Sequence, residues 1–379
     1  MQPRPVRVLV VDDAVVIRKI VTDVLREDAG IEVVGTAANG HIALQKITQV
    51  SPDVITLDVE MPEMDGIETL REIRRLYPSL PVIMFSTLTE RGASATFEAL
   101  ALGAADYVAK PANIGRVGEA LQRTRDELVP RIKAFGRRGL LARRAAPVPV
   151  TPPVTPGLPA RVAAPPPTGT SSRHAPFELL AIGVSTGGPN ALAAILPLLP
   201  QNLPVPVVLV QHMPPMFTRL LADRLNQQSR VTVIESAGGE ELIPGTVYVA
   251  PGDFHLIVER RGTRVVTGLN REPHENSCRP AVDVLFRSVA DVFGPLALGV
   301  VLTGMGQDGF RGSQDIRRQG GTILAQDEET SVVWGMPGIV ARAGLAERVV
   351  PLPDMAAEIV RRLARPAGVR TPLSTPTLR

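Results

Sequence analysis

The chain has 379 residues, enough for two domains of ordinary size. Its 41 lysines and arginines nearly balance 38 aspartates and glutamates, which disfavours a nucleic-acid-binding protein. The single cysteine excludes an intrachain disulfide and fits a reducing, cytoplasmic setting. No apolar run reaches the ~20 residues of a membrane span, so we expect no direct membrane insertion.

Residues 1–130 alternate between strand and helix patterns and are expected to form the first domain. Residues 6–11 are a continuous aliphatic run, typical of a strand buried on both faces, and a helical pattern follows at 15–26. Further strands are predicted at 32–37, 54–57, 82–85 and 106–108, and further helices at 40–49, 66–76, near 95–102 and near 117–128. Five strands alternating with five helices predict a doubly wound parallel sheet.

The composition then changes, and residues 131–176 are predicted to be a Pro-rich, extended linker. A second α/β domain is expected at 177–365. Its predicted strands lie at 179–184, 205–211, 231–234, 247–249 and 296–302, and helical patterns, one of them at 191–199, lie between several of them. The tail at 366–379 is rich in Pro and Thr and is predicted to be disordered.

Polar residues gather where the strands of the first domain end. Asp12 and Asp13 follow the first strand, Asp58 follows the third, Ser86 the fourth and Lys110 the fifth. The carboxyl ends of parallel strands meet at one edge, where ligands bind. Three converging carboxylates need a cation, and oxygen ligands suit Mg²⁺. An aspartate beside Mg²⁺ and a lysine can accept a phosphoryl group, although each residue alone could be a helix cap or a surface charge.

With Pro111 and the run at 58–66, these residues resemble the response-regulator receiver family over residues 6–128. The resemblance implies a flavodoxin-like fold and phosphorylation of Asp58 by a histidine kinase. It implies that Mg²⁺ is bound by Asp12, Asp13, Asp58 and the backbone carbonyl of Glu60. Ser86 and Tyr107 match the coupled switch positions of the family, and Lys110 would contact the phosphoryl group.

The second domain carries a candidate nucleophile, base and carboxylate at its strand ends. Ser185 lies in a G-x-S-x-G sequence between a predicted strand and a predicted helix, although a glycine turn capped by Ser185 would look the same. His212 follows the strand at 205–211, and Asp308 lies in a Gly-rich turn after the strand at 296–302. We expect the three to meet at one sheet edge, with the N–H groups of Thr186 and Met305 as oxyanion donors. The order Ser, His, Asp differs from that of α/β-hydrolases.

The stretches at 183–189, 211–213, 249–253, 279–283 and 303–309 resemble the chemotaxis protein-glutamate methylesterases, the CheB family. The resemblance implies a three-layer αβα catalytic domain, a triad of Ser185, His212 and Asp308, and no cofactor for the esterase. It implies a phosphorylation-activated hydrolase whose substrates are glutamate methyl esters on chemoreceptors (methyl-accepting chemotaxis proteins), with a histidine kinase of the CheA type as partner. Some relatives also deamidate receptor glutamines. Two alternatives stay open: a receiver-controlled regulator whose output domain binds a partner without catalysis, and a serine peptidase or lipase.

Overall fold

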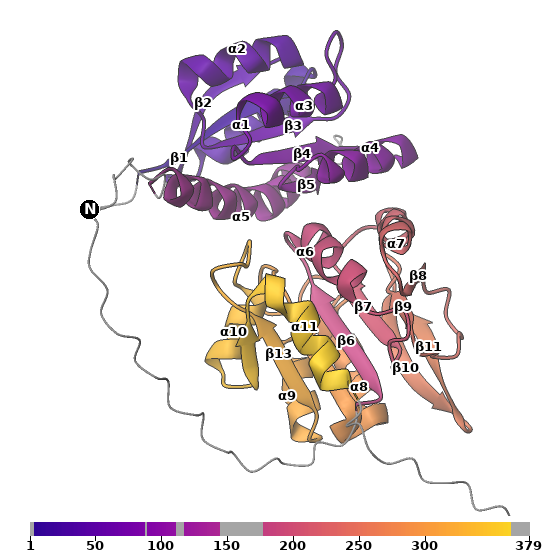
Figure 1. Ribbon diagram of the computed structural model, residues 1–379. Helices are drawn as coiled ribbons and strands as arrows, with labels where there is room; N and C mark the ends of the chain where they lie inside the picture. Colours follow the sequence, from indigo (N-terminus) through magenta and orange to yellow (C-terminus); the bar gives the residue numbers. More distant parts are fainter. Residues whose placement is uncertain (1–3, 88, 111–116, 145–176, 365–379) are drawn as a thin grey trace, which may run out of the picture.

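The computed structural model describes residues 4–87, 89–110, 117–144 and 177–364, which form two α/β domains (Figure 1). The first contains a parallel sheet in the order β2-β1-β3-β4-β5. Its strands are β1 (Val6–Val11), β2 (Ile31–Ala37), β3 (Val54–Asp58), β4 (Val82–Ser86) and β5 (Asp106–Ala109). Its helices are α1 (Val15–Arg26), α2 (Gly40–Val50), α3 (Gly66–Leu76), α4 (Glu90–Ala101) and α5 (Val117–Arg144). The predicted doubly wound sheet is therefore confirmed.

Alternate side chains of β1 supply the two cores of this domain. Val8 and Val10 pack with α1 and α5 on one face, and Leu9 and Val11 pack with α2, α3 and α4 on the other. Strands buried on both faces read as continuous aliphatic runs, which is why β1 could be predicted residue for residue.

Helix α5 is longer than predicted. The sequence indicated an end near residue 128, but the helix continues through Pro130 to Arg144. Leu128, Ile132 and Phe135 keep a helical spacing across the proline and are buried against the β1 face. Their burial offsets the main-chain hydrogen bond that Pro130 cannot donate. The rest of the predicted linker, 145–176, and the predicted tail lie outside the described residues.

The second domain is built on a seven-stranded parallel sheet in the order β14-β13-β12-β6-β7-β9-β8. The strands are β6 (Leu179–Val184), β7 (Val207–Gln211), β8 (Thr232–Glu235), β9 (Thr246–Val249), β12 (Ala297–Val301), β13 (Thr322–Gln326) and β14 (Arg348–Val350). An antiparallel hairpin, β10 (His255–Arg261) and β11 (Arg264–Asn270), was not predicted and stands outside this sheet.

Helices cover both faces of the second sheet, so the predicted three-layer αβα arrangement is confirmed. The helices are α6 (Gly188–Ile195), α7 (Phe217–Gln228), α8 (Val282–Phe293), α9 (Phe310–Arg318), α10 (Met336–Arg342) and α11 (Leu352–Leu363). Side chains of α6, α7 and α11 share one core, and those of α8, α9, α10 and the hairpin share the other. Within the described residues, no helix is long and apolar enough to cross a bilayer.

Candidate functional site

The strand order brings three polar strand ends together in the second domain. β6 is hydrogen-bonded to β12 on one side and to β7 on the other. Ser185 follows β6, His212 follows β7, and Asp308 lies in the loop between β12 and α9. All three therefore lie at the carboxyl edge of the sheet, where α/β proteins bind their ligands.

The turn that carries Ser185 is fixed by its neighbours. The Ser185 N–H donates to the Thr303 carbonyl at 3.0 Å, and the Ser185 carbonyl accepts from the Gln211 side-chain amide, also at 3.0 Å. Gly187 adopts a left-handed conformation with φ of +75°, and a Cβ added there would lie 2.6 Å from Val332. A side chain at residue 187 would thus combine backbone strain with a clash. Helix α6 begins directly after this turn, so its positive end faces the region of Ser185.

His212 and Asp308 form a direct hydrogen bond of 2.7 Å between Nε2 and Oδ2. The side chains are 13% and 2% exposed, so the pair lies largely out of water. Burial disfavours the charged carboxylate, but the hydrogen bond and charge of His212, with two main-chain N–H groups, outweigh it and hold the pKa of Asp308 below its usual value. Asp308 is therefore ionised at neutral pH and can stabilise an imidazolium.

The other ring nitrogen of His212 faces a cysteine. Nδ1 lies 3.5 Å from Cys278 Sγ, and among the contacts of the described residues no hydrogen bond joins His212 to Ser185. Burial disfavours the imidazolium, but Cys278 and Asp308 together outweigh the burial and raise the pKa of His212 above its ordinary value. The structure thus brings His212 and Asp308 together and places Ser185 at the adjacent strand end.

The first domain gathers its charged residues at the end of its own sheet. Lys110 Nζ lies 2.8 Å from Asp12 Oδ2 and 2.7 Å from Asp58 Oδ2, and single carboxylate oxygens of Asp12, Asp13 and Asp58 lie within 4.8 Å of one another. Burial and the charge of Asp12, opposed by Lys110, raise the pKa of Asp58 to about 6. Three clustered carboxylates are a hard-oxygen donor set, so these residues fit Mg²⁺. The N–H of Glu60 donates to Asp58 Oδ1 at 3.3 Å.

The two predicted switch residues differ in what they contact. Ser86 is fully buried, and its hydroxyl donates to the Gly92 carbonyl at 3.0 Å. Tyr107 stacks on Phe217 of α7, in the other domain, with ring centroids 5.0 Å apart and planes at 8°. Phe97 of α4 also lies against the Phe217 ring, with 6.2 Å between the two ring centroids. Tyr107 therefore connects the first domain to the helix that follows His212.

Polar contacts hold the first domain against the start of α6. Asn190 Nδ2 donates to the Ala104 carbonyl at 3.1 Å, and the main-chain N–H of Gly187 lies near enough to the Asp106 carboxylate to oppose the rise of its pKa. Figure 1 shows this domain lying over α6 and α7. Gly187 is two residues beyond Ser185, so the first domain contacts the turn that carries the candidate nucleophile.

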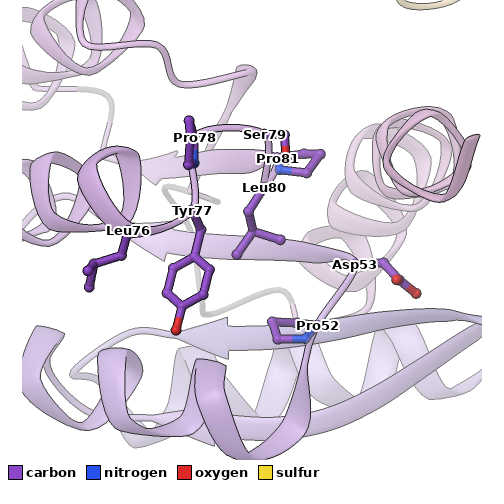
Figure 2. Close-up of a pocket in the computed structure, with 8 residues that line it drawn as sticks. All are labelled: Pro52, Asp53, Leu76, Tyr77, Pro78, Ser79, Leu80 and Pro81. Carbon is purple, nitrogen blue, oxygen red and sulfur yellow. The ribbon is translucent and has the colours of Figure 1, made fainter. Parts of the chain in front are cut away.

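A surface pocket of about 210 Å³ lies elsewhere on the first domain (Figure 2). It is lined by Pro52, Asp53 and residues 76–81, which precede β3 and β4. The pocket is therefore at the amino ends of these strands, and Asp58 is at their carboxyl edge. The pocket therefore belongs to neither candidate site.

Sequence reasoning missed several residues that support the second site. Gln211 holds the Ser185 carbonyl, and Gln326 accepts the Thr303 N–H at 2.8 Å. Asn276 and Asp283 lie beside Asp308, and Cys278 lies beside His212. Gln211 could have been found from its place at the end of a strand, next to His212. Asp283 lies in the stretch at 279–283 that resembles the CheB family, and the other three carry no signal in the sequence that points to His212 or Asp308.

Comparison with known proteins agrees with both domains. Residues 180–359 match the CheB methylesterase family, and residues 8–122 match the response regulator receiver domain. A protein-glutamate methylesterase/protein-glutamine glutaminase of Nocardioides sp. is 56% identical over 95% of this chain and 96% of its own length. A relative of the same name from Trichodesmium erythraeum is 49% identical over 94% of this chain and 99% of its own length.

The crystal structure of the Thermotoga maritima CheB methylesterase catalytic domain is 44% identical, covers 49% of this chain and 98% of its own, and has a TM-score of 0.48. The relatives from Nocardioides and Trichodesmium match both domains of this chain in one polypeptide. This chain therefore belongs to the CheB methylesterase family, with a response regulator receiver domain joined to its methylesterase domain.

Proposed function

We propose that this chain is a phosphorylation-activated protein-glutamate methylesterase that demethylates glutamate methyl esters on chemoreceptors and deamidates receptor glutamines. The observation that carries the proposal is the 2.7 Å contact between His212 and Asp308 at the strand end beside Ser185. The names of the Nocardioides and Trichodesmium relatives support both activities. A cytoplasmic location and a histidine kinase of the CheA type as phosphodonor are parts of the same proposal.

The reaction proceeds by acyl transfer through Ser185. Nε2 of His212 is engaged by Asp308, so Nδ1 is the nitrogen that accepts the Ser185 proton as the hydroxyl attacks the ester carbonyl. Asp308 stabilises the imidazolium that forms. The N–H groups of Thr186 and Met305 receive the oxyanion, near the positive end of α6. His212 then protonates the departing methanol, and water hydrolyses the acyl-enzyme. An amide substrate follows the same route and releases ammonia.

The receiver domain controls this site through Asp58. Asp58 accepts a phosphoryl group, and Lys110, which lies 2.7 Å from it, pairs with the added negative charge. Asp12, Asp13, Asp58 and the Glu60 carbonyl would hold Mg²⁺, which when bound supplies positive charge toward the phosphoryl oxygens. Phosphorylation repositions Ser86 and Tyr107, which loosens the Tyr107–Phe217 contact and opens the esterase site.

The test is methanol release from methylated receptor by the full-length protein, with and without a small-molecule phosphodonor. We expect Ser185→Ala to reduce release by at least about 10³-fold, because the nucleophile is lost, while Asp58 still accepts phosphate. Ser277→Ala, at an exposed serine of the same domain, is the matched control and should keep full activity. Undiminished release by Ser185→Ala would remove Ser185 from the mechanism. Loss of labelling by a fluorophosphonate in Ser185→Ala separates an enzyme from a regulator that only binds its partner.

A further inference from the structure

A tight turn at residues 275–278 lies beside the His212–Asp308 pair. Glu275 and Cys278 exchange two main-chain hydrogen bonds, of 3.2 and 2.9 Å. Asn276 and Ser277, between them, have φ values of 52° and 63°, as in a type I′ turn, where asparagine is favoured. Arg287 of α8 pairs with the Glu275 carboxylate at 2.8 Å and anchors the turn to that helix. Ser277 is exposed, and the Asn276 side chain contacts the buried carboxylates below it.

The amide of Asn276 is shared between two buried carboxylates. Nδ2 lies 2.9 Å from Asp308 Oδ1 and 2.9 Å from Asp283 Oδ2. Asp308 and Asp283 are 2% and 1% exposed. Ionised carboxylates only accept hydrogen bonds, so the NH₂ group and not the oxygen of Asn276 occupies this position. One asparagine therefore supplies a hydrogen to each of two like charges that water barely reaches.

Neither carboxylate is free to move away from the other. Asp308 accepts the N–H groups of Val282 and Asp283 at the start of α8, and Asp283 Oδ1 accepts the Gly312 N–H in the first turn of α9 at 2.7 Å. Asp308 thus caps the start of α8, which carries Asp283, and Asp283 caps the start of α9, which follows Asp308. Burial and the nearby Asp308 charge raise the pKa of Asp283 to about 6, and the Asn276 hydrogen bond acts in the opposite direction. This arrangement holds a second negative charge beside Asp308, the partner of His212.

We propose that Asn276 is a positioning residue of the esterase, which divides its amide between Asp283 and Asp308 so that Asp308 stays ionised and aligned with His212. The inference rests on the proposed triad and adds a residue that touches no substrate. The titratable and charged groups around Asn276 and its two aspartates are His212, Cys278, Glu275, Arg287 and Asp315.

Removing the amide changes the proton affinity of the base in a defined direction. Without its two hydrogens, the negative potential of Asp283 and Asp308 at His212 is less compensated. The imidazolium is then favoured, and the neutral base appears only at higher pH. The acid limb of the pH profile should therefore move upward, whereas a purely structural defect would lower the rate at every pH without moving the limb.

The experiment measures kcat/KM for methanol release against pH in the full-length protein with saturating phosphodonor. Asn276→Gly suits the positive φ of the turn and removes only the side chain, and Asn276→Asp keeps its shape but replaces the donor by an acceptor. Rates are divided by the number of sites that a fluorophosphonate titrates, so unfolded molecules do not contribute. Ser277→Ala changes the neighbouring residue in the same turn and is the matched control.

We expect Asn276→Gly to lower kcat/KM at neutral pH about tenfold and to move the acid limb up by about half a pH unit or more, because a hydrogen bond to a buried charge is lost. Asn276→Asp should move it further, and Ser277→Ala should leave it in place. An acid limb that stays at the wild-type pH in both Asn276 variants overturns the proposal. That result would not contradict the proposed triad, which is tested separately. The triad would be contradicted by full activity of the Ser185→Ala protein.

Discussion

Cys278 is the residue whose effect on the proposed base, His212, is simplest to predict. Its sulfur lies 3.5 Å from His212 Nδ1 and helps to raise the pKa of His212. The base must be neutral to accept a proton, so activity falls as pH drops through this pKa. Cys278→Ala removes one cause of the raised pKa, and the acid limb of kcat/KM should move down by about one pH unit. Cys278→Ser keeps a polar partner and should move it less. A limb that stays in place or moves up would contradict this role.

Predictability from the sequence differs sharply between residues of the same site. Ser185 and His212 directly follow buried strands, as Asp58 ends one in the first domain, and the strand pattern alone places them at the carboxyl edges. Asn276 could not be found in this way. It lies in a four-residue turn whose position follows no period, and its two partners are brought to it by α8 and by the loop before α9. Contacts of this kind become visible only when the tertiary structure is known.

At the scale of elements, the strength of the local pattern decided what could be predicted. β1 and α3 agree with the predicted bounds, because an aliphatic run and an amphipathic pattern with a capping box at Asp65 and Glu68 mark them clearly. The hairpin β10–β11 escaped prediction because charged residues end β10 and begin β11, and this end of the hairpin is exposed. Helix α5 extends past its predicted end near residue 128, because side chains on both sides of Pro130 stay buried against the first sheet.

Helix α11 is attached to the edge of the sheet by a charge cluster centred on Glu358. Its carboxylate pairs with Arg361 at 2.6 Å, Arg362 at 2.9 Å and, in β14, Arg348 at 2.9 Å. The hydrogen bond from Arg361, with those of the other arginines, lowers the pKa of Glu358 to about 2. A carboxylate whose pKa is lowered on folding stabilises the protein at pH values above its ordinary pKa of 4.5. This stabilisation is lost as the pH falls from 4.5 toward 2.

Glu358→Gln should therefore reduce the free energy of unfolding at neutral pH by about 1–2 kcal/mol, a value discounted because two of the arginines are largely exposed. The difference from wild type should narrow as pH falls from about 4.5 toward 2, where the wild-type carboxylate is protonated as well. Urea unfolding at several pH values measures both effects. The exposed Glu328→Gln is the control and should have little effect at any pH. A deficit that is the same at neutral and acid pH would assign the loss to packing instead of charge.

At the scale of the whole molecule, the sequence predicts two domains but not how they meet. Phe97, Tyr107 and Phe217 come from two helices and a strand that are far apart in the sequence. Phe97 and Phe217 read as ordinary core residues, and Tyr107 reads as a switch position within the first domain. In the structure the three rings join the cores of the two domains, and Asn190 adds a polar contact five residues beyond Ser185. The interface therefore uses the helices that follow Ser185 and His212.

Under the proposed control, the resting rate of the esterase depends on an aromatic contact between the two domains. Phe217→Leu keeps an apolar side chain but removes the stack on Tyr107, which is worth about 0.5–1.5 kcal/mol. The closed arrangement is weakened by that amount, so methanol release without phosphodonor should rise roughly three- to tenfold. The rate with phosphodonor should change little, because the proposed phosphorylated state has already lost the contact. Tyr107→Phe preserves both rings and should keep the wild-type activation ratio. If Phe217→Leu leaves the unphosphorylated rate unchanged, the stack does not restrain the enzyme, and restraint must come from the polar contacts at Gly187 and Asn190.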